Sequence, residues 1–155
     1  MLAARLFFDH LDTELRRSTG IQATQYEILV RLSEAPGRQL RMAELAERSL
    51  SSRSHLSHTI ARLERMGWVE RRECPTDKRG SFAGLTDSGL AALEKAAPIH
   101  VDSVRTHLFD VLGQEDLRQL GEISERLLHH LVVVQAVPPC PEKLLGLPAE
   151  PGSNQ

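Results

Sequence analysis

The segment from Ser52 to Met66 constrains the fold of this chain more than any other part of the sequence. Its apolar residues Leu56, Ile60 and Leu63 recur every three or four positions, which predicts a helix that buries one side and leaves the other side polar. Serines precede the segment and a glycine follows it, and these residue types cap the two ends of helices. The chain must therefore pack its neighbouring elements against one side of a short, well-delimited helix.

Two helices are predicted just before this capped helix. Thr24 and Glu27 have the spacing of a capping box, which predicts a helix that begins there and ends before the Pro-Gly pair at 36–37. A shorter helix follows, with Leu45 and Ala46 directed inward. Because the connections between these helices are short, we expect all three to pack together.

The residues after the capped helix predict a β-hairpin. Residues 68–73 begin with alternating apolar and polar side chains, and residues 81–85 can return as an antiparallel strand. The intervening residues 75–80 are rich in turn-forming types. The order helix, helix, turn, helix, hairpin is that of a winged helix-turn-helix.

Longer amphipathic helices are predicted on both sides of this lobe. Residues 2–17 and the residues from Gln114 onward each carry an apolar stripe at helical spacing. A further helix is expected to begin at Thr86 or Asp87 and to be interrupted or kinked near Pro98. These helices predict a scaffold that holds the lobe.

The predicted fold class is therefore mainly α (α+β), with a winged helix-turn-helix lobe on a helical scaffold. We expect one domain over residues 1–137, with the lobe at 20–86 and the scaffold at 1–19 and 87–137. Residues 138–155 are rich in proline and are predicted to be disordered.

The distribution of charge favours a polyanionic partner, although the net charge of the whole chain is -2. Residues 38–80 contain ten Lys or Arg against six Asp or Glu, a net charge of +4. The corresponding counts are four against five in residues 1–37 and five against ten in residues 81–155. A basic middle between acidic flanks is a pattern found in proteins that bind nucleic acid, although solvated basic faces are also common.

The polar side of the capped helix carries hydroxyls, an imidazole and arginines. Such side chains can enter a major groove about 12 Å wide, where Arg pairs with guanine and Ser or His bonds to phosphates or base edges. Its serine-rich N-terminus favours phosphate, because free N–H groups and the helix dipole attract an anion. The alternative is an ordinary solvated face, which would mix Glu with Lys. The candidate DNA-binding residues on this helix are Ser52, Arg53, Ser54, Ser57, His58 and Arg62.

The tip of the predicted hairpin carries a second candidate DNA-binding group, Asp77, Lys78 and Arg79. An arginine on a protruding loop can enter a narrow minor groove, and Asp77 can stiffen the loop by accepting hydrogen bonds. The pattern Asp-x-Arg, five residues, Leu-Thr that begins at Asp77 resembles the wing signature of the MarR family. Residues 50–72 resemble the recognition helix and first wing strand of the same family.

This resemblance runs from about residue 2 to residue 131. It implies a sequence-specific transcription regulator, by default a repressor, that binds an inverted-repeat operator in double-stranded DNA. It implies major-groove contacts by the helix residues named above, with Arg79 in the minor groove and Asp77 supporting it. It also implies a homodimer in which the first and last helices of two chains interlock. The residues assigned to dimerisation are Phe8, Leu11, Leu15, Leu117, Leu120, Leu127 and Leu131.

Regulation by a small molecule is a further expectation from the resemblance. The family commonly responds to small aromatic or phenolic anions bound between the scaffold and the DNA-binding lobe. The candidate residues for such an effector are Phe7, Phe8, His10 and Arg16 on the first helix. The competing interpretation is that these residues belong to the core and to interfaces, because apolar stripes are usually core.

A redox-responsive regulator is an alternative that depends on Cys74. This cysteine follows Arg71 and Arg72 at the base of the predicted wing, and nearby cations favour the reactive thiolate. A cysteine is also a small hydrophobic residue in many proteins. The sequence leaves both interpretations of Cys74 open.

Other function classes have little support in the sequence. No motif for catalysis or for a cofactor is found, so neither an enzyme nor a cofactor is predicted. No metal site is predicted from His100, His107, His129 and His130, because no pair has ligand spacing with a third ligand nearby. A winged helix that binds protein instead of DNA would need apolar anchor residues on the outer face of the capped helix, where this sequence has polar residues. The absence of a signal-peptide pattern, a membrane span or a disulfide framework predicts a cytoplasmic protein.

Overall fold

The structure is a computed structural model that describes residues 2–49, 51–74 and 77–134, with the backbone alone at 73–74, 77–80 and 132–134. The chain divides into two compact units, residues 1–111 and residues 112–155. The first unit contains the predicted winged helix and the second contains the last helix, so each is described by itself.

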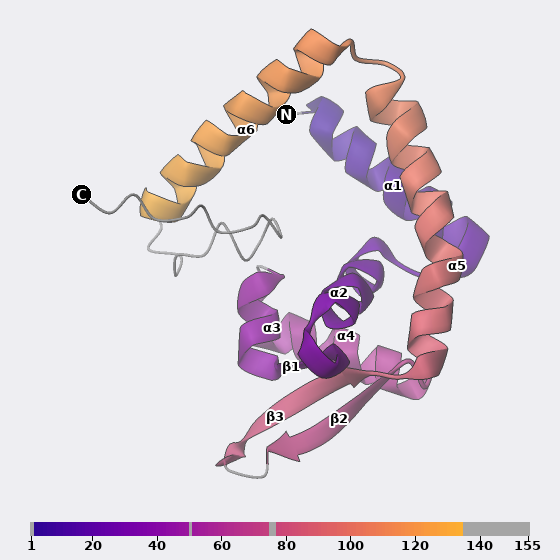
Figure 1. Cartoon of the computed structure of the whole chain (residues 1–155), viewed down its shortest axis with the longest axis vertical. Coiled ribbons are helices and arrows are strands. Elements are labelled where there is room, and N and C mark those ends of the chain that lie inside the picture. The colour runs from indigo at the N-terminus through magenta and orange to yellow at the C-terminus, as the bar shows by residue number, and fades with distance from the viewer. Residues whose placement is uncertain (1, 50, 75–76, 135–155) are drawn as a thin grey trace. The chain divides into compact units, whose positions relative to one another are not determined.

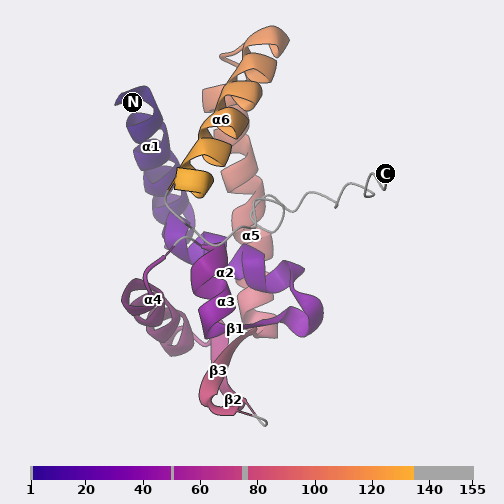
Figure 2. The same cartoon turned by 90° about the vertical axis from the view of Figure 1, so that its left-hand side faces the viewer.

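The first unit has the order of elements that the sequence predicts, with additions (Figures 1 and 2). Its elements are α1 (Leu2–Thr19), α2 (Ala23–Glu34), the 3-10 turn η1 (Pro36–Arg38), β1 (Gln39–Arg41), α3 (Met42–Arg48), α4 (Arg53–Arg65), β2 (Val69–Cys74), β3 (Asp77–Leu85), α5 (Asp87–Val104) and the π-helical segment η2 (Arg105–Phe109). The described residues are mostly helical with a small antiparallel sheet, which confirms the predicted fold class.

Helix α4 has the ends and the buried side that the sequence predicts. The Ser52 hydroxyl accepts a hydrogen bond from the N–H of His55 at 3.2 Å, and Gly67 ends the helix with a φ of 72°. The buried residues of this helix are Leu56, Thr59, Ile60 and Leu63. Its apolar stripe joins a core with residues of α2, α3 and the sheet, and burying each such leucine or isoleucine stabilises the fold by about 1.5–3 kcal/mol.

The predicted capping box of Thr24 and Glu27 is wrong, because α2 already begins at Ala23. The N–H of Ala23 donates to the Asp12 carboxylate of α1 at 2.7 Å, which satisfies a free N–H group in the first turn of the helix. Glu27 instead accepts a hydrogen bond from Arg31, one turn later, at 3.1 Å. Within the local sequence, the side-chain oxygen of Gln25 accepts a hydrogen bond from the N–H of Gln22 at 3.0 Å, so a Gln22–Gln25 capping box and the Asp12 contact both mark this boundary.

The sheet has the strand order β1-β3-β2, with both pairs antiparallel. The short strand β1 is not predicted by the sequence; it pairs with β3 through Leu40 and Ala83, which are both buried. Strand β3 begins at Asp77 instead of Ser81, so the second strand of the hairpin is longer than predicted. The last pair of the hairpin joins Cys74 to Asp77 after a break in register. Residues 77–79 thus belong to the start of a strand.

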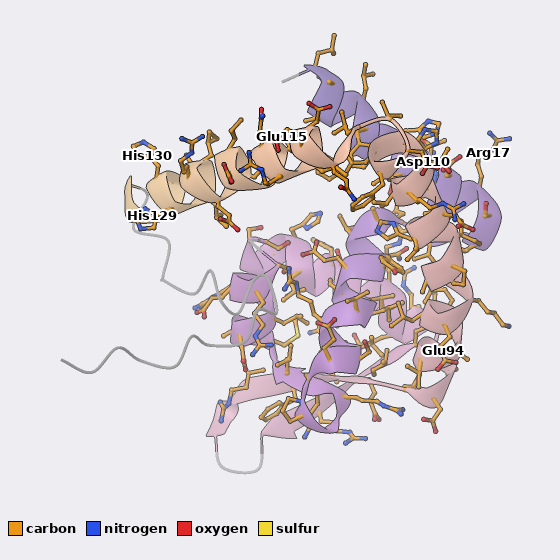
Figure 3. The ribbon with its side chains drawn as sticks, turned by 45° about the horizontal axis from the view of Figure 1, so that its top comes forward. Arg17, Glu94, Asp110, Glu115, His129 and His130 are labelled. Atoms are coloured by element: carbon orange, nitrogen blue, oxygen red, sulfur yellow. The ribbon has the colours of Figure 1, made fainter. Side chains whose placement is uncertain are left out.

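Helix α5 begins where the wing ends. It continues through Pro98 without the interruption that the sequence predicts. Its N-cap is Thr86, whose hydroxyl accepts from the N–H of Gly89 at 3.0 Å and donates to the carbonyl of Gly67 at 2.7 Å. Proline removes the hydrogen bond to the residue four positions earlier. That residue, Glu94, is exposed on α5 (Figure 3), so its carbonyl can bond to water.

Helix α1 packs against α5 within the same chain. Leu15, Ile21 and Ala96 form a small core cluster, and Leu11 is also buried. Both leucines are thus already covered inside one chain, and their assignment to a dimer interface stays a prediction. Phe8, by contrast, is 65% exposed.

The second unit contains α6 (Gln114–Val134), which begins at the predicted residue. Its apolar stripe is exposed at Leu120, Ile123, Leu127 and Leu131, and Leu117 is half-buried. The predicted tail at 138–155 lies outside the described residues. Neither α6 nor any other described helix combines the length and hydropathy required to cross a membrane.

Candidate nucleic-acid interface

The predicted DNA-binding residues of α4 lie on the side of the helix away from its buried stripe. Arg53, Ser54, His58 and Arg62 are exposed, and Ser57 is half-buried. Ser52 is exposed too, although its hydroxyl is engaged as the N-cap. The face therefore combines hydroxyls, an imidazole and guanidinium groups, which can all bond to phosphates or base edges.

Arg62 is held in place by the start of another helix. Its Nη1 donates a hydrogen bond of 3.1 Å to the side-chain oxygen of Gln22, the residue that precedes α2. The pair joins residues 40 positions apart, so the sequence does not predict it. An arginine that is fixed in one direction loses less side-chain entropy when it binds a ligand.

Arg71 of β2 is not among the DNA-binding residues predicted from the sequence. Its Nη2 donates to the carbonyl of Ser57 at 3.1 Å, and its Nε lies 3.2 Å from the carboxylate of Glu64. Both partners are on α4, so this one side chain joins the first strand of the wing to the helix with the predicted DNA-binding face.

Three arginines from different elements surround a hollow of about 260 Å³ beside this face. Arg41 precedes α3, Arg53 opens α4 and Arg71 lies in β2. The residues that line the hollow are Arg41, Met42, Ala43, Arg53, Leu56, Ser57, Arg71 and Ser81. Guanidinium groups beside two helix N-termini favour a phosphate or another anion. In the sequence, the one feature that these three arginines share is their place in the positively charged segment 38–80.

The wing consists of β2 and β3, which extend away from the helices of the unit (Figure 1). The backbone of Asp77, Lys78 and Arg79 forms the first residues of β3. The side chains of these three residues and of Cys74 lie outside the described part of the structure. Their predicted contacts with DNA, and the predicted redox role of Cys74, stay predictions.

The comparisons with known proteins agree with this geometry. The sequence model of the MarR family matches residues 21–81. The crystal structure of Sco3205, a MarR family transcriptional regulator from Streptomyces coelicolor in complex with DNA, is 50% identical with a TM-score of 0.80, and the match covers 83% of this chain and 81% of that one. The chain belongs to the MarR family. It therefore stands among transcriptional regulators and not among enzymes.

Other MarR-family proteins show the same likeness. AbsC, a MarR family transcriptional regulator from Streptomyces coelicolor, is 42% identical with a TM-score of 0.78, over 83% of this chain and 86% of that one. Transcriptional repressor MprA of Escherichia coli strain K12 is 28% identical over 76% of this chain. The match spans only 66% of the length of MprA.

The four residues predicted to bind an effector all lie on α1, and their role in this MarR-family chain stays a prediction. The rings of Phe7 and Phe8 contact each other edge to face with centroids 5.5 Å apart, and Arg16 is exposed. The His10 Nε2 lies 2.9 Å from the Nε2 of His107.

A hollow of about 580 Å³ does lie between α1 and the end of α5, with other residues around it. These are Glu14, Arg17, Ser18, Ile99, Asp102, Ser103, Thr106 and His107. Arg17 projects outward from α1 in Figure 3. A hydrogen bond from Ser103 lowers the pKa of Glu14, and the neighbouring imidazoles of His10 and His107 lower it further. Polar side chains thus line much of this hollow, and the Glu14 carboxylate in it is charged at neutral pH.

Proposed function

We propose that this MarR-family protein is a sequence-specific transcription regulator that binds double-stranded DNA as a homodimer. The observation that carries the proposal is the exposed Ser, His and Arg face of α4, with the Arg41, Arg53 and Arg71 hollow beside it. The DNA complex of Sco3205, a relative of 50% identity, supports the same use of this fold.

The arrangement suits the two grooves of B-form DNA. Helix α4 enters the major groove, where Arg62 and His58 reach base edges, and the three arginines around the hollow contact phosphates. Arg79 on the wing reaches the flanking minor groove, with Asp77 as its support. Because each phosphate contact releases counterions, the affinity falls steeply with salt.

A second copy of the chain is proposed because each unit exposes apolar side chains. On α1 these are Leu2, Leu6 and Phe8, and on α6 they form the stripe already described. Contiguous apolar stripes on a helix usually mark a contact surface. A dimer with two-fold symmetry places two α4 helices about one turn of DNA apart, so the operator is an inverted repeat.

Repression is the default outcome of this binding. A dimer that occupies a promoter blocks the polymerase, and relatives such as MprA are named as transcriptional repressors. This activity requires the compartment that holds the DNA, which in a bacterium is the cytoplasm.

Release by a small effector is the second part of the proposal. The hollow of about 580 Å³ supports it, because its volume falls in the range of small-ligand sites. Thermal-shift screening of aromatic acids, read beside release of bound DNA, tests it. An effector should raise the melting temperature and lower the affinity for DNA. If no class of compound shifts the melting temperature, the proposal of release by an effector is wrong.

Two alternatives make different demands on the chain. A protein-interaction module would carry large apolar anchors on the outer face of α4, but the described residues there are Ser, His and Arg. A redox regulator through Cys74 would lose DNA affinity after peroxide treatment. Unchanged affinity in the oxidised protein would exclude it.

Selection of bound fragments from the organism's own genome tests the main proposal. The expected result is a small set of promoter fragments that share an inverted repeat with half-sites one helical turn apart. A selected set without any common inverted repeat would contradict sequence-specific binding by a dimer.

A further inference from the structure

Two histidines and one glutamate come together on the scaffold of the first unit, outside the DNA-binding face. His10 and Glu14 are four residues apart on α1, and His107 lies in η2 after α5. Their ligand atoms lie within 4.8 Å of one another. The sequence predicts no metal site at His107 because it lacks a ligand pair at helical spacing, and its two partners lie more than 90 positions away.

Local structure explains how the three side chains meet. Residues four apart are neighbours on one face of a helix, so His10 lies next to Glu14 on α1. The chain leaves the regular α-helical path at Arg105–Phe109, where a π-helix changes the direction of the following side chains. Because α1 packs along α5, His107 then faces the His10 and Glu14 pair. Such π-helical turns are frequent at functional sites.

Hydrogen bonds alone account for only part of this arrangement. The His10 and His107 rings meet edge to face, and one imidazole N–H can donate across the 2.9 Å between their Nε2 atoms. The Glu14 Oε1, however, is 3.5 Å from the His10 nitrogen and 3.8 Å from the His107 nitrogen. Both distances exceed the usual range of an N–H to oxygen bond. A carboxylate oxygen therefore faces two imidazole nitrogens without a short bond to either.

The spacing of the three atoms matches the coordination sphere of a metal ion. The point equidistant from the two nitrogens and the oxygen lies about 2.0 Å from each atom. Zinc binds histidine nitrogen at about 2.0–2.1 Å and carboxylate oxygen at about 2.0–2.2 Å. We propose that His10, Glu14 and His107 bind a divalent transition-metal ion of the zinc type, with water completing the coordination.

The surroundings of the cluster support this role. The buried hydroxyl of Ser103 donates to the other carboxylate oxygen of Glu14, which leaves Oε1 directed to the imidazoles. Hydrogen bonds of this kind orient carboxylate ligands in metal sites. Glu14 and His107 also line the hollow between α1 and α5, so an ion has a path from solvent. Imidazole with one carboxylate suits zinc, cobalt or nickel better than magnesium or calcium, which prefer oxygen ligands alone.

The test uses the purified full chain, freed of metal with a chelator. Zinc is titrated against a chromogenic competitor, and cobalt serves as a visible-absorption probe of the same site. The expected result is one ion bound per chain. His107→Gln should weaken zinc binding on the order of 100-fold or more, and Ser103→Ala should weaken it about 10- to 100-fold as the loss of an orienting partner.

Matched variants keep the test decisive. His129→Gln changes a histidine on α6, where His129 and His130 project to different sides of the helix (Figure 3), and should leave zinc binding unchanged. His10→Gln, at a half-exposed position, repeats the test if His107→Gln fails to fold. Absence of zinc binding by the wild-type chain would overturn the proposal. Equal binding by wild type and both cluster variants would also overturn it, because the ion would then be held elsewhere. DNA plays no part in these measurements, so their outcome is independent of the proposed function.

Discussion

Arg71 on strand β2 donates a hydrogen bond of 3.1 Å from its Nη2 to the main-chain carbonyl of Ser57 on helix α4. The same guanidinium pairs with Glu64 about two turns further along α4. These contacts fix the angle between the wing and the helix with the predicted DNA-binding face. Because a dimer must place both elements in neighbouring grooves, we expect this contact to matter more for DNA binding than for folding.

Arg71→Ala should therefore weaken DNA binding more than the loss of one positive charge explains. Arg72→Ala is the matched control, since Arg72 pairs with Glu70 on its own strand. Both variants should lose at most about 1 kcal/mol of stability, because exposed ion pairs contribute little. Fluorescence anisotropy on one operator measures both affinities. Equal losses in the two variants would show that Arg71 acts only through its charge.

Arg62→Ala should weaken operator binding by about 1–3 kcal/mol, mostly at one base position. The reason is that Gln22 holds the Arg62 guanidinium on the outer side of α4, where it can reach a guanine edge. Anisotropy titrations with operators mutated at each position measure the effect. A loss of the same size on random DNA would place Arg62 on a phosphate instead.

Gly89→Ala should destabilise the fold, because the first turn of α5 packs tightly against the end of the hairpin. A Cβ at Gly89 would lie 2.1 Å from the carbonyl oxygen of Trp68 and 2.8 Å from the Leu85 side chain. Overpacking of this kind costs about 1–3 kcal/mol or more. Urea unfolding at fixed protein concentration measures it.

The control for that variant is Gly121→Ala in α6. No described atom lies within 4 Å of a Cβ added at Gly121, so the change should stabilise the helix by about 0.5–1 kcal/mol. If Gly89→Ala unfolds at the same urea concentration as the wild type, the packing described at the start of α5 is wrong.

The stability of the protein should fall between pH 7 and pH 5 in part because of His100. Burial lowers the pKa of His100, and its Nδ1 is buried without a hydrogen-bond partner among the described residues. The unfolded chain takes up a proton near the ordinary histidine pKa of about 6.5, while the folded chain does so only at lower pH. Stability is therefore fully present above that pH and is lost as the pH falls.

Urea unfolding at pH 7.5 and pH 5.5 checks this sign. His100→Gln should show a smaller loss of stability on acidification than the wild type. His129→Gln, at an exposed position on α6, should behave like the wild type. The assignment to His100 fails if all three proteins lose the same stability.

Local patterns were sufficient to predict much of the fold. The stripe of Leu56, Ile60 and Leu63, the Ser52 cap and the terminal Gly67 all depend on residues close together in sequence. Each of these features is found in the structure because helix capping and amphipathic burial are local effects.

Features that depend on distant contacts were not predicted. Asp12 of α1 accepts a hydrogen bond from the first N–H of α2, and strand β1 forms because Leu40 meets Ala83 of β3. Leu15, which the sequence assigns to a dimer interface, is covered by α5 in the same chain. An apolar stripe shows that a face is buried, but it does not show which partner buries it.

The candidate sites follow the same division. The polar face of α4 could be predicted, because one helix carries all of it. The hollow with Arg41 and Arg71, and the contact of His10 with His107, each combine residues from separate elements. No local spacing contains that information.

The central claim is that the outer face of α4 binds duplex DNA, and Ser54→Asp tests it most directly. Ser54 is the second residue of α4, where a carboxylate favours the helix through its dipole but opposes the phosphates of DNA. The variant should therefore fold at least as well as the wild type. Thr13→Asp adds the same charge on the exposed side of α1 and serves as its control.

The measurement is the affinity of the wild type and both variants for one selected operator, by fluorescence anisotropy over a series of salt concentrations. We predict an affinity that falls with salt, unchanged at low salt in Thr13→Asp and at least about tenfold weaker in Ser54→Asp. Equal binding by the two variants, or no binding of duplex DNA by the wild type at low salt, would contradict the claim.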